Sequence, residues 1–117
     1  MNQANQASNN NSQVVNSFHE EVARLLQQLV ANRHQYFPNR STAVRIHGEL
    51  TRGRPYNRMR MNRRKLLRFS VATSVQITDW RVFNRAVDLF MDTATPQEKL
   101  GYALLAEEVN TLIRRRR

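Results

Sequence analysis

Residues 69–77 decide the fold, and they read Phe69-Ser70-Val71-Ala72-Thr73-Ser74-Val75-Gln76-Ile77. The larger apolar side chains of this stretch all fall on odd-numbered positions, at Phe69, Val71, Val75 and Ile77. A period of two combined with β-branched side chains is typical of a strand with one buried face. We therefore predict a β-strand over residues 69–77.

A second strand is predicted upstream, over residues 43–50. Its apolar side chains Val44, Ile46 and Leu50 also fall on alternate positions. Paired antiparallel with residues 69–77, it forms a hairpin whose long connection is the basic segment between the strands. Because two strands alone are marginally stable in water, we expect the sheet to be completed across a homodimer or higher homo-oligomer.

An all-helical alternative remains open for the same region. Residues 57–68 are rich in Arg, Met, Lys and Leu, which are good helix formers. In that alternative, residues 57–76 form a central helix and the domain contains no hairpin.

Helices are predicted on both sides of this region. The first covers residues 17–35, because Ser17 to Glu20 has the form of a capping box and apolar residues recur behind it at helical spacing. Pro38 disfavours helical geometry at the residue before it and so places the end of this helix.

Two more helices are predicted in the last third of the chain, over residues 79–92 and 96–113. Thr78 or Asp79 caps the first of them, and its helical spacing favours core packing of the aromatic side chains at Trp80, Phe83 and Phe90. The second begins with Thr95-Pro96-Gln97-Glu98, a capping box with proline at the first helical position.

The predicted fold class is therefore α+β and mostly helical: an N-terminal helix, a two-stranded hairpin with a basic loop, and two C-terminal helices. Residues 17–113 form a single domain that contains the basic segment 51–68. Residues 1–16 are predicted to be a disordered polar arm, since MNQANQASNNNSQ has too little apolar surface to offset its ordering entropy. Residues 114–117 form a basic tail.

Charge is concentrated in two places along the chain. The net charge of the 117 residues is +10, yet outside two clusters the seven basic side chains are outnumbered by nine acidic ones. The twelve clustered cations are Arg52, Arg54, Arg58, Arg60, Arg63, Arg64, Lys65 and Arg68, then Arg114, Arg115, Arg116 and Arg117. Seventeen of the nineteen basic residues are arginine. The planar guanidinium grips phosphate oxygens bidentately, so this choice favours a polyanionic partner.

These clusters predict a nucleic-acid-binding protein that is not an enzyme and has little sequence preference, with RNA favoured over DNA. Arginine contacts to phosphate give affinity without reading bases. All twelve clustered cations are predicted contact residues. Tyr56 joins them as a candidate for stacking on a base, because no apolar periodicity assigns it to a core.

A protein-interaction adaptor is the alternative function. In it, Arg63-Arg64-Lys65 and the terminal arginine run serve as nuclear or nucleolar localisation signals. The helical body then binds another protein through apolar helix faces that are partly exposed. Attachment to an anionic membrane surface ranks last, since no amphipathic helix sets large apolar residues opposite the arginines.

Several classes of protein find no support in the sequence. His19, His34 and His47 lack the mutual spacing of a metal pair, the chain has no cysteine, and neither a glycine-rich phosphate loop nor a serine nucleophile signature is present. We expect no catalytic residues, no metal and no cofactor. No apolar run reaches the roughly 20 residues of a membrane span and no secretory signal is visible, so an intracellular location, in cytoplasm or nucleus, is expected.

In general style the chain resembles small proteins encoded by RNA viruses. The shared features are a short polar arm, a compact, mostly helical body without cysteine, and clusters of arginine. Viral nucleocapsid proteins and small silencing suppressors that sequester RNA have this style. The resemblance implies an RNA-binding role but assigns no function to an individual residue.

Overall fold

The regular structure in the described part of the chain is entirely helical. The computed structural model describes residues 2–52 and 60–115, with side chains from residue 17 onward. In chain order the elements are α1 Asn2–Ala31, the short 3-10 helix η1 Arg33–Gln35, α2 Ala43–Thr51, α3 Arg63–Ala72, α4 Trp80–Asp92 and α5 Pro96–Arg115. The predicted hairpin of strands 43–50 and 69–77 is therefore wrong, and the all-helical alternative fits the structure. Within these residues, no helix combines the length and apolar character needed to cross a membrane.

Helix α2 replaces the first predicted strand because its apolar residues also satisfy a helical period. Its buried residues are Ala43, Ile46 and His47. The side chain of Thr42 caps the helix by accepting a hydrogen bond from the backbone N–H of Arg45 at 3.2 Å. Val44, which a strand would have buried beside Ile46, is 71% exposed. Three apolar residues on alternate positions were too few to distinguish the strand period of two residues from the helix period of 3.6.

Helix α3 occupies the first part of the second predicted strand. Asn62 caps it, since its side-chain oxygen accepts a hydrogen bond from the N–H of Lys65 at 2.8 Å. The fully buried side chains are Leu66, Leu67 and Val71. The amides of Ser74 and Val75 both donate to the carbonyl of Val71, and the chain then leaves the helix. Burial of the leucines thus outweighs the β-propensity of the residues that follow them.

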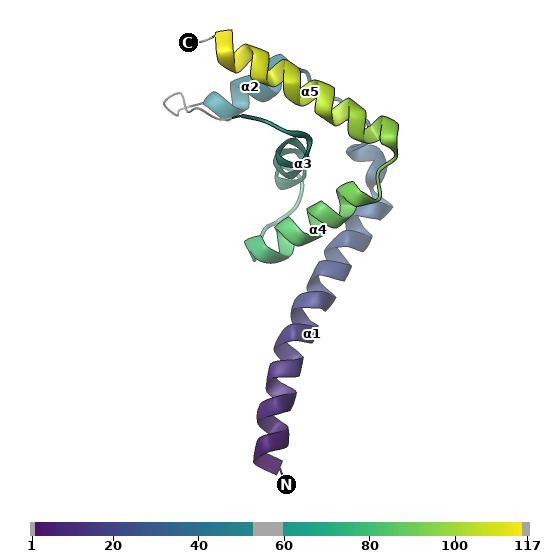
Figure 1. The fold of residues 1–117 in the computed structure, drawn as a ribbon, viewed down its shortest axis with the longest axis vertical. Coiled ribbons are helices and arrows are strands. Elements are labelled where there is room, and N and C mark those ends of the chain that lie inside the picture. The colour runs from purple at the N-terminus through teal and green to yellow at the C-terminus, as the bar shows by residue number, and fades with distance from the viewer. Residues whose placement is uncertain (1, 53–59, 116–117) are drawn as a thin grey trace.

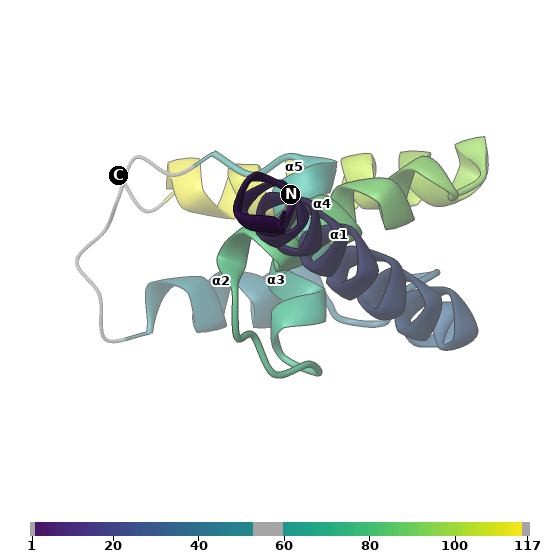
Figure 2. The same ribbon diagram turned by 90° about the horizontal axis from the view of Figure 1, so that it is seen from below.

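Helix α3 lies at the centre of the molecule. Figure 1 shows it nearly end-on, with α5 on one side and α4 on the other, and Figure 2 gives the view turned by 90°. It packs against both of these helices, while α2 packs against α5 and α1 packs against α4. The most basic helix of the chain therefore contributes directly to the core.

Helix α1 contacts the rest of the protein through its second half. Val22 packs with Val82 and Ala86 of α4 in a small cluster, and Leu29 joins the main core. The helix begins at Asn2, so Ser17 lies inside it and is not its cap. That residues 1–16 are a disordered arm stays a prediction.

Aromatic side chains hold the connection that follows α1 against α4 and α5. Phe37 lies between two rings, 5.1 Å from the ring centre of Phe90 and 5.3 Å from that of Tyr102. The Tyr102 hydroxyl donates a hydrogen bond to the backbone carbonyl of Tyr36. Burial of this hydroxyl raises the pKa of Tyr102 above its ordinary value, so it remains a donor throughout the physiological range.

The two C-terminal helices have the predicted boundaries to within two residues. Asp79 caps α4 by accepting a hydrogen bond from the N–H of Arg81 at 2.9 Å. The capping box before α5 also forms, with Thr95 and Glu98 each accepting a hydrogen bond from the other's backbone N–H. Local capping signals were thus sufficient to locate both helices.

Candidate nucleic-acid interface

The basic segment is fixed to α5 at Met61 by a single buried side chain. Asn110 is 3% exposed. Its amide oxygen accepts a hydrogen bond from the N–H of Met61 at 2.6 Å, and its amide nitrogen donates to the Met61 carbonyl at 2.8 Å. This pair imitates the hydrogen bonding of a neighbouring strand and satisfies both backbone groups of a buried residue. Helix α3 starts two residues later, so its first turn has a defined position.

Four basic side chains gather around that first turn, and we call them the α3 cluster. Its members are Arg60, Arg63, Arg64 and Lys65, all exposed. The first turn of α3 contains no acidic residue. Cations at a helix N-terminus lie at the positive end of the macrodipole, where negative groups are favoured. The α3 cluster therefore destabilises the helix that carries it, unless an anion binds there.

Asp88 of α4 neutralises part of the basic segment. One terminal nitrogen of Arg68 lies 3.0 Å from both carboxylate oxygens of Asp88, and Arg64 approaches the same carboxylate at 3.6 Å. The Arg68 side chain is 33% exposed, against 62% for Arg64. Arg68 is thus engaged in joining α3 to α4, whereas Arg64 also presents its guanidinium to solvent.

The other predicted contact residues lie at helix C-termini or outside the described residues. Arg52 follows α2, and Arg114 and Arg115 end α5. The C-terminal ends of α2 and α5 lie at the same end of the molecule (Figure 1). The structure thus brings Arg52 to the same end of the molecule as Arg114 and Arg115, while Arg63, Arg64, Lys65 and Arg68 lie on the central helix α3. Five predicted contact residues fall outside the described residues, namely Arg54, Tyr56, Arg58, Arg116 and Arg117.

Sequence reasoning missed a basic and aromatic group on α4. Arg81 and Arg85 are exposed, and they precede Asp88 by seven and three residues. That spacing puts them on the side of α4 to which Arg64 reaches. Trp80, assigned to the core by its spacing, is 62% exposed. The spacing of Arg81 and Arg85, four residues apart, could have indicated from the sequence that α4 has a basic face.

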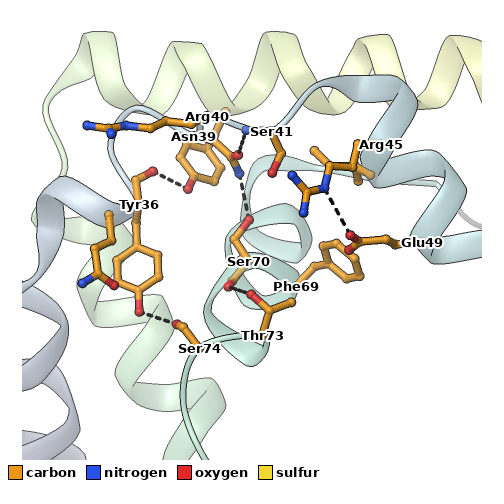
Figure 3. Close-up of a pocket in the computed structure, with 13 residues that line it drawn as sticks. Tyr36, Asn39, Arg40, Ser41, Arg45, Glu49, Phe69, Ser70, Thr73 and Ser74 are labelled. Carbon is orange, nitrogen blue, oxygen red and sulfur yellow. Dashed lines mark hydrogen bonds and ion pairs between the residues drawn. The ribbon is translucent and has the colours of Figure 1, made fainter.

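A polar cavity of about 270 Å³ lies between the η1–α2 connection, α2 and α3 (Figure 3). Several of its polar groups bind one another. Asn39 donates to the hydroxyl of Ser70 at 2.8 Å, and the hydroxyls of Tyr36 and Ser74 are 2.6 Å apart. These hydrogen bonds hold the η1–α2 connection against α3 and its C-terminal end. We therefore assign these polar side chains a structural role and no ligand. Among the described residues, no group of three His, Cys, Asp or Glu side chains is placed to hold a metal ion.

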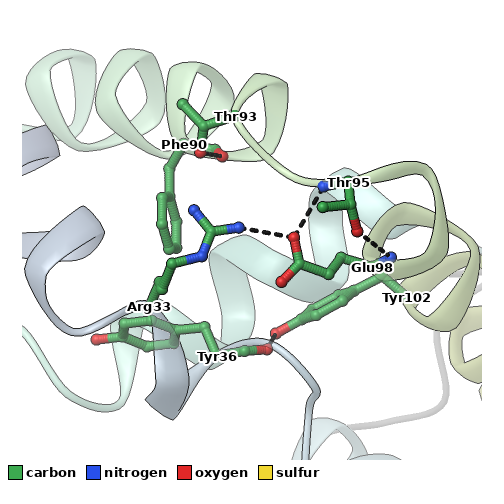
Figure 4. Close-up of polar contacts among 7 residues, drawn as sticks. All are labelled: Arg33, Tyr36, Phe90, Thr93, Thr95, Glu98 and Tyr102. Carbon is green, nitrogen blue, oxygen red and sulfur yellow. Dashed lines mark hydrogen bonds and ion pairs between the residues drawn. The ribbon is translucent and has the colours of Figure 1, made fainter.

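Glu98 joins the start of α5 to η1 through Arg33 (Figure 4). Its carboxylate accepts hydrogen bonds from the N–H of Thr95 at 2.8 Å and from the guanidinium of Arg33 at 2.6 Å. The bond from the Thr95 backbone, supported by the charge of Arg33 and opposed by partial burial, lowers the pKa of Glu98 below its ordinary value of 4.5.

This lowered pKa predicts a contribution to acid sensitivity. A carboxyl group whose folded-state pKa is depressed stabilises the fold above its unfolded pKa and loses that contribution as the pH falls through the folded pKa. Between about pH 6 and about pH 3, the wild type should therefore lose more unfolding free energy than Glu98→Gln. Urea titrations at several pH values measure the difference. Parallel losses in the two proteins would contradict the role assigned to Glu98.

Comparison with protein-family models, curated proteins and solved structures gives no match for this chain. The function is therefore argued from its own residues.

Proposed function

We propose that the protein binds nucleic acid, RNA in preference to DNA, through arginine–phosphate contacts that do not read the base sequence. The observation that carries this proposal is the α3 cluster. Exposed basic side chains surround a helix N-terminus, the positive end of the helix dipole, where the N–H of Lys65 is capped by Asn62 and the earlier N–H groups have no partner within the helix. Side-chain cations and helix dipole favour the same ligand, a phosphate group.

The surroundings of the α3 cluster support an extended anion more than a small one. Arg52, Arg114 and Arg115 lie at the ends of α2 and α5, and Arg81 and Arg85 continue on α4. Cations on four helices are more than a single phosphate needs. A nucleic-acid backbone offers one phosphate per nucleotide and can meet several of them at once. The preference for RNA rests on the resemblance to small RNA-virus proteins.

Salt dependence is the decisive test of this function. If six of the twelve clustered cations meet phosphates, the affinity for a labelled 20-nucleotide single-stranded RNA should fall about 300-fold between 50 and 200 mM salt. Fluorescence anisotropy measures the dissociation constants, with DNA of the same sequence as the comparison for RNA preference. An affinity that does not change with salt would exclude the phosphate-contact mechanism.

A protein-interaction adaptor stays the second candidate, because α5 also exposes apolar side chains. Leu100 is 56% exposed and Leu104, one turn later, is 57% exposed. Beside them, Pro38, Gly101 and Leu105 line a hollow rimmed by Glu98 and Glu108. Removing both arginine clusters distinguishes the two functions. An adaptor should retain its protein partner in pull-down experiments, and a nucleic-acid-binding protein should lose RNA.

A further inference from the structure

The indole ring of Trp80 is exposed although the residue belongs to a well-packed helix. Trp80 is the only tryptophan of the chain and the first residue of α4, and it is 62% exposed. The next residue along, Arg81, has a side chain that is 86% exposed. A large aromatic ring left in water forgoes the free energy that its burial would give. The residues on either side of Trp80 in the sequence are Asp79 and Arg81, so the exposed ring has charged neighbours and no apolar ones.

Trp80 is held in place by a residue of the core. Its ring centre lies 5.4 Å from that of Phe83, with the two ring planes at 89°. Phe83 is itself only 2% exposed. The perpendicular contact fixes the indole on a rigid support while most of its surface remains open to solvent. A flat ring prepared in this way can accept a stacked base with little loss of conformational entropy.

The position of Trp80 relative to the cations suits a nucleic-acid strand. Arg64 of the α3 cluster reaches Asp88. Trp80 precedes Asp88 by eight residues, so it lies about 12 Å away along the axis of α4. Arg81 and Arg85, both exposed, lie between them along the helix axis, and Arg81 also contacts Asp79 at 3.7 Å. Around the axis, Trp80 is about 80° from Asp88, so the strand must turn across α4 to reach the indole. A strand whose phosphates contact the α3 cluster can follow these arginines and bring a base to the indole.

We propose that Trp80 stacks on an unpaired base and that the natural ligand is consequently single-stranded nucleic acid. The inference rests on the proposed function and adds the form of the ligand to it. In a duplex the faces of the bases are covered by their neighbours, so a duplex can meet the phosphate contacts and leave the indole free. A single strand can make the phosphate contacts and also stack a base on the indole. Stacking of this kind tolerates every base sequence.

The test follows the intrinsic fluorescence of the protein, which has no second tryptophan to obscure the signal. Titration with a 12-nucleotide oligouridine and oligoadenine should quench the indole emission in step with binding measured by anisotropy. A 12-base-pair RNA duplex should bind without comparable quenching. In Trp80→Ala, affinity for the single strand should fall about 5- to 100-fold, and affinity for the duplex should change less than twofold.

Leu104→Ala is the matched control, since it removes a similarly exposed apolar side chain from α5. It should leave both affinities unchanged, and circular dichroism should show that both variants keep their helices. Trp80→Phe retains a smaller ring and should recover part of the affinity. Normal RNA binding without quenching, or equal losses on single strand and duplex, would overturn the stacking inference alone. Absence of any RNA binding would overturn the proposed function as well.

Discussion

Alanine at all four positions of the α3 cluster is expected to weaken RNA binding about 10²-fold at physiological salt. Each phosphate contact to a single strand contributes about 0.7 to the slope of log affinity against log salt concentration, so the slope should fall by about 2.8. The large effect is expected because these cations are exposed and surround an anion-binding helix end. Anisotropy titrations at four salt concentrations measure both quantities.

The matched control replaces Arg114, Arg115, Arg116 and Arg117 with alanine and removes the same number of charges. Arg114 and Arg115 end a helix, where cations already interact favourably with the negative end of the dipole. We therefore expect a smaller loss of affinity. Equal losses in the two variants would show that net charge alone drives binding. The α3 variant should also unfold at a temperature no lower than the wild type, because it loses unfavourable charges at the positive end of the dipole.

Asn110→Ala is expected to give the largest loss of stability, about 2–5 kcal/mol of unfolding free energy. The substitution leaves the N–H and the carbonyl of Met61, a residue only 4% exposed, without their partners. Each unsatisfied buried group costs about 1–3 kcal/mol, and the better helix propensity of alanine offsets only a part of this. Urea unfolding followed by circular dichroism measures the change.

Asn84→Ala serves as the comparison for Asn110→Ala. Asn84 is a half-buried asparagine of α4 whose side chain forms no hydrogen bond within the described part of the chain. It should change the unfolding free energy by less than about 0.5 kcal/mol. If Asn110→Ala and Asn84→Ala had the same free energy of unfolding, the Met61–Asn110 contact would make no contribution to stability. A loss of RNA affinity that accompanies the loss of stability would indicate that this contact also positions the α3 cluster.

The sequence predicted the C-terminal helices well because their ends carry strong local signals. The box from Thr95 to Glu98 and the cap at Asp79 each depend on residues at most three positions apart.

The region from 43 to 77 was predicted wrongly for a physical reason. Short apolar runs fit both the strand period and the helix period, and packing of α2 and α3 against other helices decides between them. Caps at Thr42 and Asn62 were the local signals that favoured helices.

The cations of the candidate site were predictable and their surroundings were not. Charge clustering alone singled out Arg60, Arg63, Arg64 and Lys65, whose contact with nucleic acid stays a prediction. The engagement of Arg68 with Asp88 spans 20 residues and required the packing of α3 on α4. Trp80 follows the apolar spacing of α4, but as its first residue it has no preceding helical turn to cover it. Periodicity describes the middle of a helix better than its ends.

The attachment of Met61 to Asn110 also links stability to ligand concentration. The two residues are 49 positions apart, and the contact fixes the start of a ten-residue helix that is too short to persist alone. A chain that releases this contact loses the first turn of α3 at the same time, so under the proposed function only the folded form would bind phosphate tightly. By mass action, a ligand at 100 times its dissociation constant adds about 2.7 kcal/mol to the stability of such a protein. If the proposed function is correct, bound nucleic acid supplies anions beside the cations of α3, and the bound protein should be more stable than the free protein.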